Sequence, residues 1–162
     1  MKIYYKIDDF LDARSKLNSK KIILVPTMGS IHEGHISLIN KAKSYADIVI
    51  VTIFINPIQF NSSIDYDSYP RSIEEDKKTL EKNGVDILFC PSTPEIYPEK
   101  FQTSVNVRLF SEVLEGKFRK GHMEGVATIV TKLFNLVRPD FAIFGEKDFQ
   151  QLLLLQSFVP AL

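Results

Sequence analysis

Short apolar runs alternate along the chain with longer segments in which apolar residues recur every three or four positions. The short runs predict buried strands, at residues 22–25, 48–55, 85–90 and 141–144. The periodic segments predict helices, at residues 7–19, 33–46, 72–82, 125–137 and from Asp148 into the leucine-rich stretch. Near-continuous apolar strands are typical of sheets that are buried on both faces. The pattern therefore predicts an α/β fold, a Rossmann-like, doubly wound and mainly parallel sheet with helices on both faces.

Prolines, glycines and short alternations refine this outline. Pro26 is expected to end the first strand, and the pair at 83–84, Asn-Gly, is expected to end the helix before it. Residues 91–100 contain three prolines and predict an irregular loop. Apolar residues alternate with polar ones at 105–109, which predicts a half-buried strand, and residues 110–114 predict a short helical turn.

Composition narrows the class of protein. The 162 residues fit one domain at ~150 residues per domain, and 44% are hydrophobic, which is enough for a packed core. Twenty Lys and Arg balance twenty Asp and Glu, so we expect no nucleic-acid partner. Cys90 is the only cysteine and cannot form an intrachain disulfide, and no run of ~18 apolar residues occurs. We therefore expect a cytoplasmic location and no membrane contact.

The segment PTMGSIHEGH, at residues 26–35, follows the first predicted strand and enters a helix. His32 and His35 are three positions apart, so they share one face of the first helical turn. Backbone N–H groups and the helix dipole favour an anion there. Neither the P-loop nor the Gly-x-Gly-x-x-Gly pattern occurs at this turn, so histidine N–H groups are expected to act on a phosphate.

Two other interpretations of these histidines stay open from the residues alone. In the first, His32 caps the helix and His35 is an ordinary surface residue. In the second, both bind zinc with Cys90 or His122, although the usual His-Glu-x-x-His pattern has a spacing of four and not three.

The turn resembles that of the His-x-Gly-His nucleotidylyltransferases, and more narrowly that of the pantothenate synthetases. Matching segments cover most of the chain in the family's order: PTMGSIHEGH, FINPIQF at 54–60, YPR at 69–71, LEGKFRKGHMEGV at 114–126, KLFNLVRPD at 132–140 and FGEKDFQQ at 144–151. The resemblance implies an ATP- and Mg²⁺-dependent ligase that condenses pantoate with β-alanine. It also implies a pantoyl adenylate intermediate, with release of pyrophosphate and then AMP.

The resemblance assigns roles to residues in two segments that follow strands. It implies that His35 and His32 are catalytic, with His35 at the position of a general acid. It assigns ATP binding to Met28, Gly29, Ser30, Ile31, His32, Glu33, Gly34 and His35, and to Gly145, Glu146, Lys147 and Asp148. Without the resemblance, residues 145–148 would be interpreted as a solvated helix start with Asp148 near the N-cap.

Further residues carry substrate and metal predictions. The resemblance implies that Gln59 and Gln151 bind pantoate and β-alanine. By itself, Gln59 would be interpreted as a loop side chain bonded to the backbone. Glu75 and Asp76 are the candidate Mg²⁺ ligands, although acidic residues on such a helix usually face water.

The domain prediction places a nucleotide-binding catalytic domain at residues 1–153 and a divergent tail at 154–162, without the second domain of the family. We therefore expect folding, weak synthetase activity and association into a homodimer. The alternative is a catalytically silent module that binds nucleotide or dimerises. A weaker alternative keeps the nucleotidyl transfer and changes the acceptor.

Overall fold

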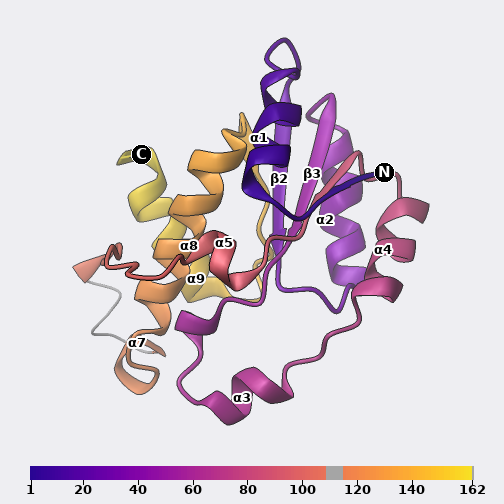
Figure 1. Cartoon of the computed structure of the whole chain (residues 1–162). Helices are drawn as coiled ribbons and strands as arrows, with labels where there is room; N and C mark the ends of the chain where they lie inside the picture. Colours follow the sequence, from indigo (N-terminus) through magenta and orange to yellow (C-terminus); the bar gives the residue numbers. More distant parts are fainter. Residues whose placement is uncertain (109–114, 162) are drawn as a thin grey trace.

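The computed structural model describes residues 1–108 and 115–161 and shows one parallel sheet with helices around it (Figure 1). The sheet has the order β1-β4-β3-β2-β5, with β1 at Lys2–Tyr4, β2 at Ile22–Thr27, β3 at Ile48–Ile53, β4 at Ile87–Phe89 and β5 at Phe141–Ala142. All four strand pairs are parallel. The predicted α/β fold with a parallel sheet is confirmed.

Helices cover both faces of this sheet. The α-helices are α1 Ile7–Ser15, α2 Glu33–Lys43, α3 Ser63–Ser68, α4 Ile73–Lys82, α5 Thr93–Ile96, α7 Glu115–Phe118, α8 His122–Val137 and α9 Phe149–Phe158, with 3-10 turns η1 at Pro57–Gln59 and η2 at Val159–Ala161. In Figure 1, α8 and α9 lie to the left of β2 and β3, and α2 and α4 lie to the right. None of the helices within the described residues has the length and apolar content that a membrane span requires.

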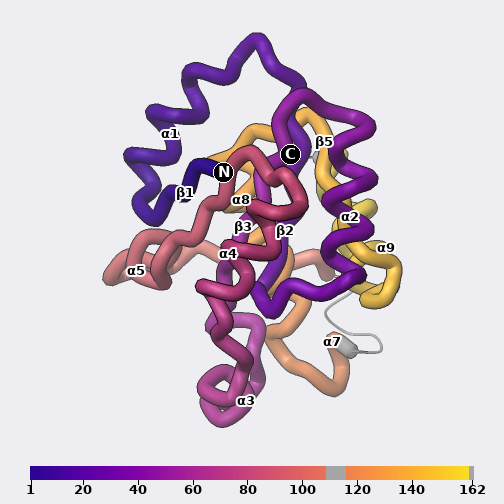
Figure 2. The backbone as a smooth tube through the Cα atoms, turned by 90° about the vertical axis from the view of Figure 1, so that its right-hand side faces the viewer, coloured from indigo at the N-terminus to yellow at the C-terminus, as the bar shows by residue number. Residues whose placement is uncertain are grey.

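Alternate residues of β2 belong to two separate cores. Ile22 and Leu24 pack with α1, α8 and α9, whereas Ile23 and Val25 pack with α2 and α4. A strand buried on both faces needs apolar side chains at successive positions, which explains the unbroken apolar run. The tube view in Figure 2 shows α1 and α2 on opposite sides of the strands.

The strand order reverses beside β2, since β3 and β4 lie on one side of it and β5 on the other. Pro26 does not end β2, which continues to Thr27, so that expectation was wrong. The carbonyls of Ile22 and Leu24 accept N–H groups from the β5 segment, so residues of this parity face β5. Pairing with β5 ends at Ala142, so Pro26 needs no N–H on that side. The two strands therefore part at their carboxyl ends.

Other differences have local causes. The predicted strand at 105–109 is wrong for its described part, since Val105 donates its N–H to Thr128 Oγ1 of α8 (2.9 Å) and lies against that helix, while residue 109 and the turn at 110–114 lie outside the described residues. The expected loop at 91–100 contains α5, which Pro94 helps to start. The expected boundary after residue 153 falls inside α9, whose Leu154, Leu155 and Phe158 are buried.

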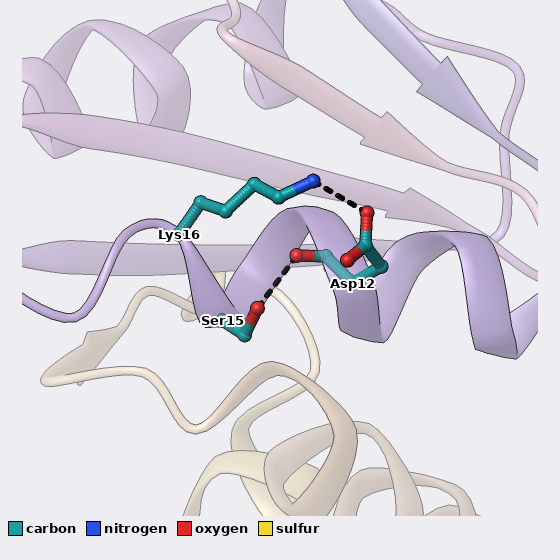
Figure 3. Close-up of polar contacts among 3 residues, drawn as sticks. All are labelled: Asp12, Ser15 and Lys16. Atoms are coloured by element: carbon teal, nitrogen blue, oxygen red, sulfur yellow. Dashed lines mark hydrogen bonds and ion pairs between the residues drawn. The ribbon is translucent and has the colours of Figure 1, made fainter.

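At the end of α1, an exposed ion pair contributes little to the stability of the fold. Figure 3 shows Lys16 reaching back one turn to Asp12, 2.6 Å from Nζ to Oδ2, beside the bond from Ser15 Oγ to the Asp12 carbonyl. Both charged side chains are about 69% exposed. Water screens such a pair, whereas α1 is held on the protein by its buried Phe10, which stacks on Phe89 of β4, and by Arg14, which donates to the carbonyls of Val137 and Arg138.

Candidate active site

The candidate site lies at the carboxyl ends of the parallel strands, at the lower edge of the sheet in Figure 1. The turn from Met28 to Ile31 leaves β2 at this edge and leads into α2. η1 follows β3 there, and the segment from Gly145 to Asp148 leads from the β5 side into α9. This edge is where open α/β sheets bind ligands, at the point where strand order reverses.

A buried carboxylate of α4 holds the turn. Asp76 is 4% exposed and accepts the N–H of Ser30 at Oδ2 (2.9 Å) and the N–H of Ile31 at Oδ1 (2.8 Å). Gly29 has φ +84° and Ser30 has φ +51°. A Cβ on Gly29 would lie 3.0 Å from Asp76 Oδ2, so the glycine is needed for conformation and for space.

His32 and His35 form a capping box at the start of α2. His32 is the N-cap, and its Nδ1 accepts the N–H of Gly34 (3.0 Å), while Nδ1 of His35 accepts the N–H of His32 (3.3 Å). The ring centroids are 4.2 Å apart. A neutral imidazole whose Nδ1 accepts a bond carries its proton on Nε2. Both rings therefore present an Nε2–H donor away from the backbone.

Most of the backbone N–H groups that were expected to bind an anion at this turn already donate hydrogen bonds within the protein. Five of the six N–H groups from Gly29 to Gly34 donate to protein groups: Thr27 Oγ1, the two Asp76 oxygens, His35 Nδ1 and His32 Nδ1. A phosphate at this turn would therefore meet the imidazole Nε2–H groups before it meets the main chain. The interpretation of His32 as a helix cap is correct, and it is compatible with a role toward phosphate.

The pKa of His35 is lowered from its ordinary value of 6.5. Burial of the ring is the main cause, and the His32 ring and the Lys147 ammonium act in the same direction, while the Asp76 carboxylate opposes them. His35 is thus neutral at pH 7 and acts there as a hydrogen-bond donor. The effect of Lys147 also places the segment 145–148 within electrostatic reach of the histidines.

Gln59 lies beside the turn at the end of η1 and is 8% exposed. Its Oε1 accepts a bond from Asn56 Nδ2 (3.0 Å), and its Nε2 donates to Met28 Sδ (3.0 Å). Tyr97 donates its hydroxyl to Asn56 Oδ1 (2.8 Å). The structure thus brings the predicted ATP residue Met28 and the predicted substrate residue Gln59 together.

The N-terminus of α8 holds η1 in place from the other side. Gly125 lies so close that a Cβ would be 2.8 Å from Gln59 Cα and Ile58 O. Nδ1 of the buried His122 is 2.8 Å from the Gln59 carbonyl. The glutamine main chain is therefore fixed by α8, and its amide is fixed by Asn56.

The remaining predicted residues are more exposed. Gly145, Glu146, Lys147 and Asp148 are all exposed, and Gln151 is partly buried in the first turn of α9. A Cβ on Gly145 would meet only Leu38 Cδ1 at 4.0 Å, an ordinary contact, so packing does not require this glycine. Burial raises the pKa of Tyr69, and the Asp76 and Asp148 carboxylates add to this rise, so Tyr69 lies within electrostatic reach of both.

The metal predictions find little support in the geometry. Within residues 1–108 and 115–161 no group of three His, Cys, Asp or Glu side chains could hold a metal ion. Burial raises the pKa of the Cys90 thiol to about 12, and a protonated thiol is a poor zinc ligand. Asp76 uses both oxygens on the turn, and Glu75 is exposed. The assignment of Glu75 and Asp76 to Mg²⁺ stays a prediction.

Comparison with known proteins decides the family. The profile of the family described as pantoate-beta-alanine ligase matches residues 2–162. The chain belongs to this family. The pantothenate synthetase of Caldicellulosiruptor saccharolyticus is 51% identical over 164 residues, and that of a Thermoanaerobacter species is 53% identical over 147 residues. These alignments cover 100% and 91% of the chain and 58% and 52% of the two relatives, so the chain spans little more than half their length.

Solved structures of pantoate-beta-alanine ligases share the fold closely. The enzyme of Francisella tularensis, complexed with beta-gamma ATP and beta-alanine, superposes with a TM-score of 0.96 at 44% identity. The match covers 99% of this chain and 62% of that one. Pantothenate synthetase of Thermus thermophilus superposes with a TM-score of 0.93 at 41% identity, over 99% of this chain and 58% of that one.

Two residues that sequence reasoning did not assign to the candidate site support the Gln59 side chain. Asn56 and Tyr97 fix the Gln59 amide, and they are 41 positions apart in the sequence. Asn56 stands inside the FINPIQF segment, which was the available signal for it. Tyr97 lies in the proline-rich stretch, where no periodicity marks a role.

Proposed function

We propose that the protein acts in the ATP-dependent condensation of pantoate with β-alanine, through a pantoyl adenylate. Membership of the pantoate-beta-alanine ligase family supports this proposal, as does the Francisella tularensis structure complexed with beta-gamma ATP and beta-alanine. The single observation that carries it is the arrangement of His32 and His35. Their Nε2–H groups face away from the backbone at the carboxyl edge of the sheet, in the segment that also carries Met28, whose Sδ accepts a hydrogen bond from Gln59 Nε2.

In this proposal ATP lies across the carboxyl ends of β2 and β5. Its phosphates meet His32 and His35, and Lys147 adds a positive charge from the segment that opens α9. Pairing of β2 with β5 ends at Leu24 and Ala142, and we place the nucleotide between the turn that follows β2 and the segment 145–148. The catalytic unit comprises the predicted residues 1–153 together with the rest of α9, whose apolar side chains belong to the same core.

The first chemical step transfers AMP to pantoate. A carboxylate oxygen of pantoate attacks the α-phosphorus, the bond from that phosphorus to the bridging oxygen breaks, and pyrophosphate leaves with the electron pair. Negative charge grows on the phosphoryl and leaving oxygens, so hydrogen bonds from His35 Nε2 and His32 Nε2 strengthen as the reaction proceeds. Since His35 is neutral at pH 7, its task is donation of a hydrogen bond and not of a proton.

The second step forms the amide. The amine of β-alanine attacks the acyl carbon of the adenylate, AMP leaves with the electron pair of the broken C–O bond, and the amine loses a proton. The proposed contacts of the organic substrates are Gln59 and Gln151. Gln59 Nε2 donates to a thioether sulfur, which is a weak acceptor, so a hydroxyl or carboxylate oxygen of pantoate can replace that contact at little cost.

Mg²⁺ fits this site as an ion held mainly by the ATP phosphates, because such sites need few protein ligands. It would neutralise phosphate charge when bound. Glu75 directly precedes Asp76, the residue that binds the turn, and its acidic side chain is exposed to solvent.

We also propose a homodimer and a cytoplasmic location. A cavity of about 640 Å³ lies beside the edge strand β5 and is lined mainly by apolar residues, among them Tyr45, Phe134 and Phe141. Phe141 and Tyr45 are 46% and 50% exposed, and exposed apolar surface of this kind is typical of protein contacts. Light scattering on the purified protein would test the dimer, and a monomer at all concentrations would contradict it.

The function is tested by pyrophosphate exchange into ATP, measured with and without pantoate, and by AMP release on addition of β-alanine. The proposal expects exchange only with pantoate and AMP release only with all three substrates. Binding of ATP without either reaction would favour the silent nucleotide-binding module. Exchange with an acid other than pantoate would favour a different acceptor.

A further inference from the structure

Among the groups described as accepting the N–H groups of the turn, only the Asp76 carboxylate comes from a distant part of the sequence. It lies 46 and 45 positions after the two residues whose N–H groups it accepts, Ser30 and Ile31. Three other aspartates also accept a main-chain N–H, and all three are exposed: Asp47 from Lys21, Asp86 from Val49 and Asp140 from Ile22. Asp76 alone among these four is buried.

The turn that Asp76 holds is conformationally strained. Ser30 has φ +51° without being glycine, and it follows Gly29 at φ +84°. A left-handed serine is less stable than an extended or helical one, so the turn needs an external constraint. Two hydrogen bonds to a buried carboxylate are strong enough to supply it.

The constraint reaches the histidines through one peptide unit. Ile31 N–H is bound by Asp76, and the next N–H, that of His32, donates to Nδ1 of His35. This second bond selects the His35 tautomer that carries its proton on Nε2. A shift of the turn would misdirect the His32 N–H and release that tautomer.

We propose that Asp76 is a positioning residue: its buried carboxylate fixes the strained turn at residues 29–31, and the fixed turn holds His35 with its Nε2–H toward the ligand. This role is distinct from metal binding. Its consequence for catalysis rests on the proposed function, whereas its consequence for His35 does not.

The test compares Asp76→Asn with Asp86→Asn in the full chain. An asparagine can accept one of the two N–H groups, but its NH₂ faces the other N–H. In Asp76→Asn the amides of Ser30 and Ile31 should exchange with solvent roughly tenfold to hundredfold faster, as expected when a hydrogen bond to a charged group is lost. The ¹⁵N chemical shifts of the His35 ring should change from those of the Nε2–H tautomer to those of a mixture of the two tautomers. Asp86→Asn removes the charge from a carboxylate that accepts the N–H of Val49, away from the turn, and should leave both signals unchanged.

A second variant keeps the test decisive if Asp76→Asn does not fold. Ser30→Gly removes the penalty of the positive φ, so the double variant Asp76→Asn with Ser30→Gly should fold and recover part of the His35 signal. In the unaltered protein, NMR scalar couplings should be detectable across the two hydrogen bonds, from the amide nitrogens of Ser30 and Ile31 to the Asp76 carboxylate carbon. Absent couplings, or the same His35 signal in Asp76→Asn as in Asp86→Asn, would overturn the proposal.

Turnover supplies the catalytic part. Asp76→Asn should lower kcat at least about tenfold, with a smaller change in KM for pantoate, because the lost alignment acts on the transition state. If the unaltered protein shows no pantoate-dependent exchange, the proposed function fails. The tautomer measurement still decides the role of Asp76.

Discussion

Gly34 and His32 are in direct contact across the first turn of α2: a Cβ on Gly34 would lie 2.8 Å from Cε1 and 3.0 Å from Nδ1 of the His32 ring. The ring can cap the helix only because the residue two positions later has no side chain. This contact gives a physical reason for glycine in the His-x-Gly-His pattern.

Gly34→Ala should therefore impair catalysis more than stability. The added methyl displaces the exposed His32 ring and breaks its cap, a loss of about 1 kcal/mol, while alanine in place of glycine within a helix gains about as much. The free energy of unfolding should change little, whereas kcat should fall. Gly145→Ala is the control for stability alone, since its methyl meets only Leu38 at 4.0 Å but residue 145 is itself predicted to bind ATP. A large loss of stability in Gly34→Ala with normal kcat would contradict this account.

The lowered pKa of His35 makes stability depend on pH. The folded protein holds this ring neutral below pH 6.5, where the unfolded chain takes up a proton. The unfolded state thus binds more protons, and the free energy of unfolding should fall as the pH drops below about 6.5. An NMR titration should place the His35 midpoint below 6.5. His35→Gln should flatten the pH dependence of stability, and an unchanged slope would assign it to other groups.

His35→Ala should mainly slow adenylate formation. Its hydrogen bond strengthens as phosphoryl charge develops, and removal of one such donor typically costs about a hundredfold to a thousandfold in kcat. Single-turnover measurement of pyrophosphate release would show the loss. An equal loss of ATP affinity with unchanged kcat would make His35 a ground-state contact.

Gln59→Ala should mainly weaken pantoate binding, so KM for pantoate should rise more than kcat falls. Tyr97→Phe provides a graded comparison. It leaves the Gln59 side chain in place but removes the hydroxyl that donates to Asn56 Oδ1, a buried acceptor whose loss of a partner costs about 1–3 kcal/mol. Stability should fall in Tyr97→Phe, with a smaller rise in KM than in Gln59→Ala. Unchanged pantoate affinity in Gln59→Ala would remove this glutamine from the pocket.

The sequence was most informative where one physical cause dominates locally. β2 and β3 are buried on both faces and are therefore near-continuous apolar runs in the sequence, and α8 shows helical periodicity although residues 125–130 are buried at every position. β1 was missed because its three residues at an edge alternate too briefly to show a pattern. The expected strand end at Pro26 was wrong because proline interrupts a sheet only where its missing N–H would have bonded to a neighbouring strand. Pro26 faces the side on which pairing with β5 has already ended.

The candidate site was predictable only as far as it is local in sequence. His32, Gly34 and His35 interact within one helical turn, so their spacing carries the information. Asp76 acts on the turn from α4, and no spacing rule connects positions 46 residues apart. Its predicted metal role came from its charge and from its place behind the YPR segment of the family, and neither distinguishes a carboxylate bound to amides from one that is free to bind an ion.

The most direct test of the central claim is a crystal structure of the protein with a non-hydrolysable ATP analogue and pantoate. The account predicts phosphate oxygens at about 2.7–3.2 Å from Nε2 of His32 and of His35, with pantoate against the Gln59 amide. A cavity of about 320 Å³ borders the turn itself, with Met28, Gly29 and Asp76 in its lining together with Arg71 and Cys90. Phosphates at the amino ends of the strands, or out of hydrogen-bond reach of both histidines, would contradict the account.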